Sequence, residues 1–214
     1  MPLRSTVVAL LALALLVPAA AGAMTIEKGI KAGVNLADFR GEFADIADTR
    51  TRLGFVGGPF VAFGFAPDLA MQVEALYSMK GAKTTSQRTD QDGNVLGTFD
   101  TFVDLSYLEV PVLLRGTLLR HAPVQPMYYL GPTFGFSLGG KVRSSASGLP
   151  TQDLEHLKAV DFGLALGVGA GFELGGQKVR AEFRYSPGLS DIYDLEGNAE
   201  SINNVFSFTA GLAF

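Results

Sequence analysis

The sequence predicts an all-β fold: an eight-stranded antiparallel up-and-down β-barrel, closed on itself and embedded in a membrane. Apolar residues alternate with small or polar residues in eight separate runs, which is the period of a strand with two different faces. The connections between these runs are alternately long and short. Hydrophobic residues make up 48% of the chain and charged residues only 18%, below the roughly 25% usual in soluble domains. These features together are typical of outer-membrane barrels.

The first 23 residues have the features of a secretory signal peptide. One basic residue, Arg4, precedes an apolar run over 7–17, and small residues follow up to Ala21-Gly22-Ala23. The run is shorter than the roughly 20 residues that a membrane-spanning helix needs. We therefore expect a signal peptide over 1–23, cleaved near Met24, and a barrel domain over 24–214 in the bacterial outer membrane. An uncleaved membrane anchor is the alternative.

The strands follow from the alternation, in chain order. They are expected at 30–36, 53–65, 69–80, 102–118, 128–139, 160–174, 178–189 and 204–214. In the fourth run the apolar positions change parity. Val103, Leu105 and Tyr107 are expected to face outward before the pattern changes to Leu108 and Val110, which predicts a β-bulge near Tyr107.

The connections give the orientation of the barrel in the membrane. Short links are expected at 66–68, 119–126 and 175–177, and longer ones between the first two strands and at 84–100, 141–158 and 190–203. Because the strand number is even, both chain ends lie on one side. This predicts short periplasmic turns and four longer extracellular loops.

The composition of the two faces indicates which one meets lipid. The polar face carries mostly Gly, Ser, Thr and Ala with a few charges, which suits a cramped interior. The apolar face carries large aromatics near the strand ends, at Tyr77, Tyr128, Tyr185 and Phe206. We therefore expect the apolar face to be on the outside of the barrel, in contact with outer-membrane lipid. The alternative is a soluble, lipocalin-like barrel with its apolar face inside.

The glycine-rich stretch GVGAGFELGG, 167–176, predicts a specific hairpin register. With Gly175-Gly176 as a two-residue turn, Gly167 faces Arg184, Gly169 faces Glu182, Gly171 faces Arg180 and Glu173 faces Lys178. An eight-stranded barrel is just wide enough for side chains to fill it. The glycines are therefore expected to make room for the long charged side chains.

A set of charged residues of both signs is expected in the lumen. Its members are Lys31, Glu74, Glu109, Arg115, Asp161, Glu173, Lys178, Arg180, Glu182 and Arg184. Charges in a membrane-embedded interior must pair or be hydrated. The expected arrangement is a network of salt bridges and hydrogen bonds that plugs the barrel, and the alternative is a narrow polar or proton path.

Several functional classes are excluded or disfavoured. The chain has no cysteine and two histidines, and its net charge is −4, so no metal site, cofactor or nucleic-acid partner is expected. The glycine motifs at 135–142 and 167–171 lack the spacing and context of nucleotide-binding loops. Catalysis would depend on His156 near Asp153, Glu155 and loop serines at 144, 145 and 147, and nothing in the sequence fixes a Ser–His–acid geometry.

Six segments resemble the PorT-type family of outer-membrane β-barrel proteins. They are KAGVNLADF (31–39), ALYSMKGAK (75–83), SYLEVPVLLR (106–115), YYLGPTFGF (128–136), RYSPGLSDI (184–192) and the terminal NNVFSFTAGLAF. The resemblance implies a barrel in the outer membrane but carries over no catalytic residues. The namesake of the family takes part in protein secretion. The end of the chain, with Phe206, Phe208, Leu212 and Phe214 on one face, is similar to the signal read by the barrel-assembly machinery.

These observations predict a non-enzymatic outer-membrane barrel that acts through its extracellular loops. The loops are polar and on balance acidic, at Asp45, Asp48, Asp90, Asp92, Asp153, Glu155, Asp191, Asp194 and Glu196. Binding of an extracellular or envelope protein, or support of the envelope or of secretion, is the expected role. A narrow channel for small solutes is the alternative, and a lipid-modifying enzyme dependent on His156 is the third hypothesis.

Overall fold

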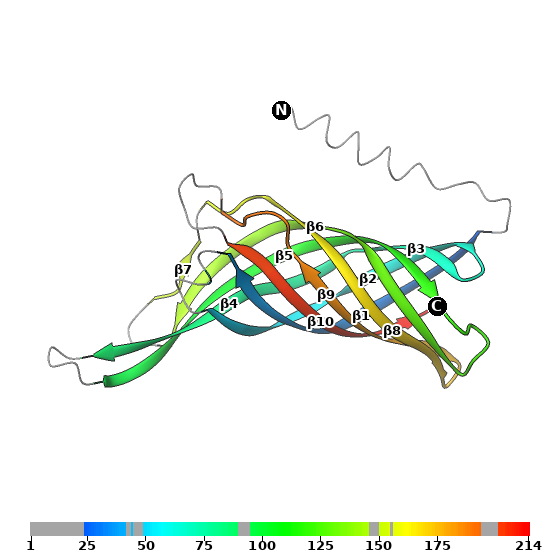
Figure 1. Ribbon diagram of the computed structural model, residues 1–214, viewed down its shortest axis with the longest axis horizontal. Coiled ribbons are helices and arrows are strands. Elements are labelled where there is room, and N and C mark those ends of the chain that lie inside the picture. The colour runs from blue at the N-terminus through cyan, green and yellow to red at the C-terminus, as the bar shows by residue number, and fades with distance from the viewer. Residues whose placement is uncertain are drawn as a thin grey trace, which may run out of the picture.

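The chain forms one β-barrel, elongated along its axis, in a computed structural model (Figure 1). The structure describes residues 24–41, 44, 49–89, 95–145, 150–154, 156–193 and 201–214. The predicted signal peptide lies outside these residues. So do the acidic loop positions 45, 48, 90, 92, 155, 194 and 196, together with Ser147.

The strands close into a ring. They are β1 (Thr25–Arg40), β2 (Thr49–Ala66), β3 (Leu69–Glu74), β4 (Leu76–Thr89), β5 (Val95–Thr117), β6 (Val124–Ser144), β7 (Gln152–Asp153), β8 (Val160–Leu174), β9 (Gln177–Pro187) and β10 (Ile202–Ala213). β3 and β4 act as one barrel strand, because Ala75 between them donates its N–H to the carbonyl of Pro59 at 3.0 Å. The short β7 pairs only with β6.

The ring has eight antiparallel strands, as predicted. Its order is β1, β2, β3 with β4, β5, β6, β8, β9 and β10, and the pairing of β1 with β10 closes it. Backbone hydrogen bonds between Lys28 and Phe214 extend this closure to the last residue. Closure removes every free edge within the ring, which a barrel in lipid requires.

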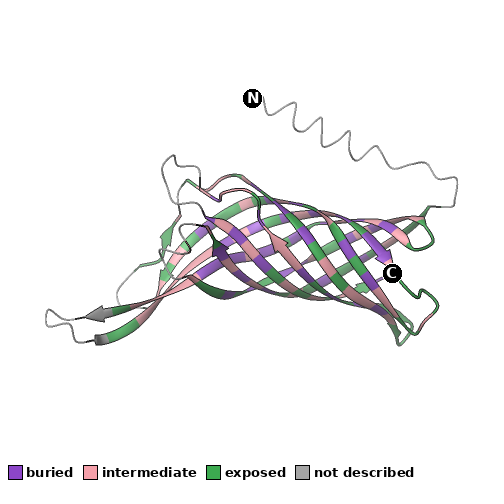
Figure 2. Ribbon diagram, viewed as in Figure 1, coloured by how far each residue is buried: buried purple, intermediate pink, exposed green. Residues whose placement is uncertain are grey.

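The two faces of the strands differ as the alternation predicts. Buried and exposed residues alternate along each strand of the barrel (Figure 2). Large apolar side chains are exposed on the outside, for example Leu166 at 50% and Phe208 at 48%. The inward positions are mostly buried, and ten of the buried side chains in the described ranges are charged. An apolar exterior around a charged interior is the arrangement of a barrel surrounded by lipid.

The glycine-rich hairpin has the predicted register. Gly167 pairs with Arg184 and Gly169 with Glu182, around a turn at Gly175 and Gly176. Both turn glycines have positive φ, 60° and 79°, as a two-residue turn of this kind requires. A β-carbon at Gly167 would lie 2.8 Å from Cγ of Arg184. These glycines therefore leave space that the facing side chains need.

Gly171 departs from the prediction. It pairs with Arg180 in the ladder, but a β-carbon there would meet the methyl group of Met127 at 2.5 Å. The space that this glycine leaves is filled by a thioether from β6, and not by the guanidinium opposite.

The prediction for β5 was wrong in one respect. A register shift does occur between Ser106 and Tyr107 in the pairing of β5 with β6, but Leu138 of β6 is the unpaired residue. The parity of β5 therefore does not change, and Leu105 and Tyr107 face inward, each only 1% exposed. The prediction assumed that apolar residues face outward, whereas this end of the lumen is itself apolar.

The two ends of the barrel differ. At one end the strands are joined by short turns at Pro67-Asp68, 118–123 and Gly175-Gly176. At the other end β4 and β5 extend beyond the barrel as a two-stranded ribbon, paired as far as Thr89 and Val95 (Figure 1). The connection expected as a loop over 84–100 is therefore largely a β-hairpin. Within the described residues, no helix is both long and apolar enough to cross a membrane.

An apolar cluster closes the lumen at the ribbon end. Its buried members are Phe39, Ala82, Leu105, Tyr107 and Ile192. Partly buried residues from the long connections, including Leu154, Leu157 and Tyr193, pack against it. We call this set the apolar cap.

Candidate functional site: the charged lumen

Four charged side chains meet in the middle of the barrel, and we call them the central quartet: Lys31, Glu74, Glu182 and Arg184. Lys31 Nζ donates to Glu74 Oε1 at 2.9 Å and to Glu182 Oε2 at 2.7 Å. Both terminal nitrogens of Arg184 donate hydrogen bonds to Glu74 at 2.6 Å, and NH2 also donates one to Glu182 at 2.6 Å. Each side chain is nearly inaccessible to solvent, and the two positive and two negative charges balance.

Neighbouring polar and aromatic groups surround the quartet. The hydroxyl of Tyr129 donates a hydrogen bond to Glu182 at 3.1 Å, and the side-chain amide of Gln72 donates one to Glu74 at 2.5 Å. The guanidinium of Arg184 lies 5.0 Å from the ring centre of Tyr129. The carboxylates thus have several donors each, which buried charges need in order to be tolerated.

A second group lies toward the short-turn end, and we call it the basal arginine pair: Arg115 and Arg180. Both guanidinium groups contact Glu27, Arg115 through NH1 at 3.3 Å and Arg180 through NH2. Both also donate to Oε1 of Gln72, at 3.1 and 3.4 Å. Two cations therefore share one carboxylate.

A third group, the upper cluster, lies between the quartet and the apolar cap. Lys80 Nζ is 3.3 Å from Glu109 and 3.9 Å from Asp161. Asp161 also accepts hydrogen bonds from Ser190 at 2.7 Å and from Asn203 at 2.8 Å. Here two carboxylates share one cation.

The structure therefore brings eight of the ten predicted lumen residues into three charged groups. Glu173 and Lys178 are opposite each other in the ladder between β8 and β9, but both are exposed at the mouth of the short-turn end.

The sequence reasoning missed several members of these groups. Lys80 and Gln72 have the same parity as Glu74, and Glu27 has the same parity as Lys31, so the alternation carried the signal. Tyr129, which the alternation places on the same face as Gly131 and Thr133, also lies inward among the charges and is 1% exposed.

The lumen leaves little free space between the charged groups. A small cavity of about 20 Å³ lies between Arg184 of the quartet and Glu109 of the upper cluster, and Thr133, Ser186 and Ser207 are among the residues that line it. That volume is about the size of one water molecule. No group of three or more metal-ligating side chains occurs among the described residues.

The candidate catalytic histidine lies at the surface. His156 is exposed and has a positive φ of 61°. The hydroxyl of Ser145 accepts a hydrogen bond from the backbone N–H of Asp100 at 2.7 Å. The carboxylate of Asp153 forms an ion pair with Lys141 at 3.9 Å. These contacts tie Ser145 and Asp153 to other partners than His156. Glu155 and Ser147 lie outside the described residues.

The predicted insertion signal lies on the lipid-facing side of β10 and at the chain end. Phe206, Phe208 and Leu212 are 39%, 48% and 43% exposed, and Phe214 is 72% exposed. Phe206 and Phe208 both pack against Phe183 of β9, with ring centres 5.9 and 4.7 Å apart. Their role in insertion stays a prediction.

The ribbon carries its own ion pair. Lys83 Nζ lies 2.7 Å from Asp100, which also accepts a hydrogen bond from Thr85 at 2.8 Å. The hydrogen bonds from Lys83 and Thr85 lower the pKa of Asp100 below its ordinary value. Lys83 and Arg143 both lie over the ring of Phe102, at 5.7 and 5.6 Å, so the base of the ribbon is held by charge and packing together.

Comparison with solved structures finds several outer-membrane proteins to which this chain is similar. One is the surface protein NspA of Neisseria, with 14% identity, a TM-score of 0.48, and coverage of 90% of this chain and 100% of that one. A major outer membrane protein of Thermus thermophilus has 16% identity and a TM-score of 0.48, covering 89% and 100%. The protease OmpT of Escherichia coli has 12% identity and a TM-score of 0.42, covering 88% and 96%.

Comparison with curated protein sequences gives no match. The profile of the outer membrane protein beta-barrel domain matches residues 21–194, most of the chain. The chain therefore belongs to the outer membrane protein beta-barrel domain family and is an integral barrel of the bacterial outer membrane.

Proposed function

We propose that the protein is a non-enzymatic outer-membrane barrel with a plugged lumen, which acts through its extracellular end. The observation that carries this proposal is that the lumen is blocked at two levels. The central quartet blocks its middle and the apolar cap closes the ribbon end. In barrels of this kind the short turns face the periplasm. The ribbon and the long connections therefore extend to the cell exterior.

The extracellular role is binding a partner protein or supporting the envelope or secretion. The ribbon offers the surface for it, since β4 pairs with β2 only as far as Thr84 and continues to Thr89. Within the described ranges, no strand pairs with β4 beyond Thr84 on that side, and a strand edge of this kind pairs readily with an added strand. A PorT-like part in secretion is one form that this role could take.

Planar-bilayer conductance separates the plugged barrel from the narrow channel. The plugged barrel gives no steady current as purified. Arg184→Ala should raise the current only if the quartet is the plug, whereas an exposed control, Lys141→Ala, should leave it unchanged. A steady current through the unmodified protein would refute the plug and favour the channel.

Site-specific photo-crosslinking on intact cells tests the extracellular role. A photoreactive residue at Gln87, exposed on the ribbon, should give a discrete protein adduct. The same group at Leu166, on the lipid face, is the matched control and should give none. Absence of any adduct from the ribbon would argue against partner binding there. A His156→Ala variant with altered outer-membrane lipid would instead support the enzyme hypothesis.

A further inference from the structure

The barrel has a vestibule at its short-turn end that the proposed function does not use. Its volume is about 710 Å³, and residues of β1, β5, β6, β8 and β9 line it together with the turn over 118–123. Arg115 and Arg180 are part of its lining and Glu27 lies beside them. The vestibule therefore gives the periplasm access to the basal arginine pair.

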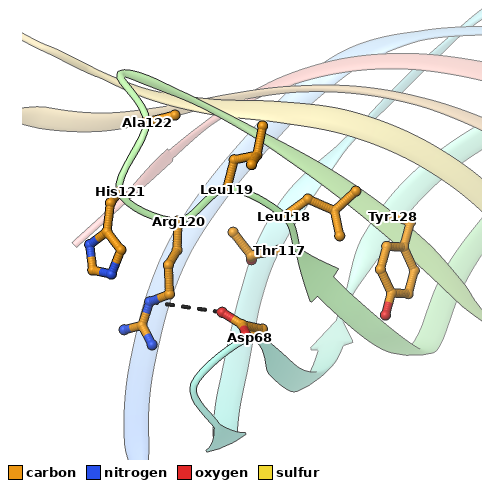
Figure 3. A pocket seen from close by; sticks show the side chains of 8 residues that line it. All are labelled: Asp68, Thr117, Leu118, Leu119, Arg120, His121, Ala122 and Tyr128. Carbon is orange, nitrogen blue, oxygen red and sulfur yellow. Dashed lines mark ion pairs between the residues drawn. The ribbon is translucent and has the colours of Figure 1, made fainter.

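The charge of the vestibule is not balanced. Four cationic side chains line it, Arg115, Arg120, Lys178 and Arg180, against two anionic ones, Glu27 and Glu173. Arg120 reaches toward Asp68 of the neighbouring turn, at 3.9 Å, as Figure 3 shows. One positive charge remains in excess even after that pair is counted, and it lies at the base, where two arginines share one carboxylate.

The rest of the lumen cannot neutralise this excess. Glu74 and Glu182 are the nearest carboxylates deeper in the barrel, and Lys31 and Arg184 already pair with both. The ring of Phe60 lies between the two groups, 5.2 Å from Lys31 and 5.4 Å from Arg180. A buried excess charge in this position favours a counter-ion from solution, because a narrow cleft of one sign concentrates the opposite ion.

The basal groups also have the geometry to hold an oxyanion. A single oxygen of Glu27, Oε1, contacts NH1 of Arg115 and NH2 of Arg180, so one carboxylate oxygen already bridges the two guanidinium groups. Arg115 is only 8% exposed, and its Nε has no hydrogen-bond partner among the described residues. Paired guanidinium groups with spare N–H donors are suited to phosphate. The side chain of Glu27 is 21% exposed and can be displaced.

We propose that the periplasmic vestibule binds a small, freely diffusing oxyanion of the phosphate class, held between Arg115 and Arg180. Glu27 competes with this ligand for the two guanidinium groups. Lys178 and Arg120 at the mouth attract the ligand without contacting it at the base. The anion comes from solution and not from a lipid headgroup, because the site faces the inside of the barrel wall.

Calorimetric titration of inorganic phosphate into the detergent-folded protein, in a phosphate-free buffer of low ionic strength, tests the proposal. We expect saturable binding that Arg115→Gln or Arg180→Gln weakens by about tenfold or more, as loss of a charge-assisted contact implies. Glu27→Gln should tighten binding, because it removes the competing carboxylate. Lys141→Gln, exposed at the opposite end, is the matched control and should change nothing.

Each other outcome overturns the proposal. Absence of saturable binding, or equal losses in the arginine variants and in Lys141→Gln, would remove the site. Gel mobility with and without boiling shows whether the arginine variants fold. If they do not, the Glu27→Gln variant tests the proposal alone, and an unchanged phosphate affinity in that variant would contradict it. Phosphatidic acid added to the micelles should not displace phosphate. Displacement would assign the site to a lipid headgroup, and a failure in any of these arms leaves the extracellular role untouched.

Discussion

Replacing Glu74 by glutamine removes one negative charge from the central quartet with almost no change in volume. Glu74 is 1% exposed and accepts hydrogen bonds from Lys31, Gln72 and both terminal nitrogens of Arg184. In the variant, Lys31 and Arg184 share the single carboxylate of Glu182. The interior then carries an uncompensated positive charge, which water cannot easily reach.

The size of the effect follows from that imbalance. Removing one partner of a buried ion pair costs about 3–5 kcal/mol, which lowers the ratio of folded to unfolded protein by roughly two to four orders of magnitude. An exposed pair gives the comparison. Lys83 and Asp100 are 2.7 Å apart with side chains 32% and 31% exposed, and solvent screens such a pair, so its loss has a far smaller effect.

Urea unfolding of the protein in lipid vesicles measures the difference. The chain has no tryptophan, so the folded fraction is read from the fast-migrating unboiled band on a gel. Glu74→Gln should shift the midpoint strongly downward and Lys83→Gln only slightly. Combining Glu74→Gln with Arg184→Gln leaves Lys31 and Glu182 as a neutral pair, so the double variant should lose less than the sum of the single ones.

Two results would contradict a tightly coupled quartet. One is a Glu74→Gln variant as stable as Lys83→Gln, which would mean that the quartet is hydrated or adaptable. The other is strict additivity in the double variant, which would mean that Glu74 and Arg184 are not coupled through the contact that the structure shows.

Three further predictions concern the wall and the ribbon. Gly169→Val should destabilise the barrel by about 1–3 kcal/mol in the same assay, because a β-carbon there would lie 2.7 Å from the carbonyl oxygen of Ala181. A neutral result would show that the lumen has spare room. Leu166→Arg on the lipid face should cost up to about 2–4 kcal/mol and slow folding into vesicles, whereas Leu166→Phe should be tolerated; equal behaviour of the two would place this face in water. NMR titration should give Asp100 a pKa below the ordinary carboxyl range. Its ionised form therefore stabilises the ribbon at neutral pH, and this stabilisation is lost as the pH falls through the lowered pKa. The Lys83→Gln variant should move that titration upward, and no change would contradict the hydrogen bond.

The sequence by itself determined the barrel and which side of it meets lipid. The period of two is a local property of an extended chain, so strands such as β8 could be read directly from Val160–Leu174. The register of β8 with β9 was also predictable, because the Gly175-Gly176 turn joins adjacent strands and fixes every pair after it. Such pairs between adjacent strands can be predicted without knowing the rest of the structure.

Only the tertiary structure decided which charges meet across the lumen. Glu74 of β3 contacts Arg184 of β9, and these strands are not neighbours in the ring. Such contacts depend on the tilt and stagger with which the whole barrel closes, which no single strand encodes. The inward position of Leu105 and Tyr107 has a related cause. At that end the lumen is closed by apolar side chains from distant connections, so an apolar residue there can face inward, and alternation alone cannot distinguish the cap from the lipid.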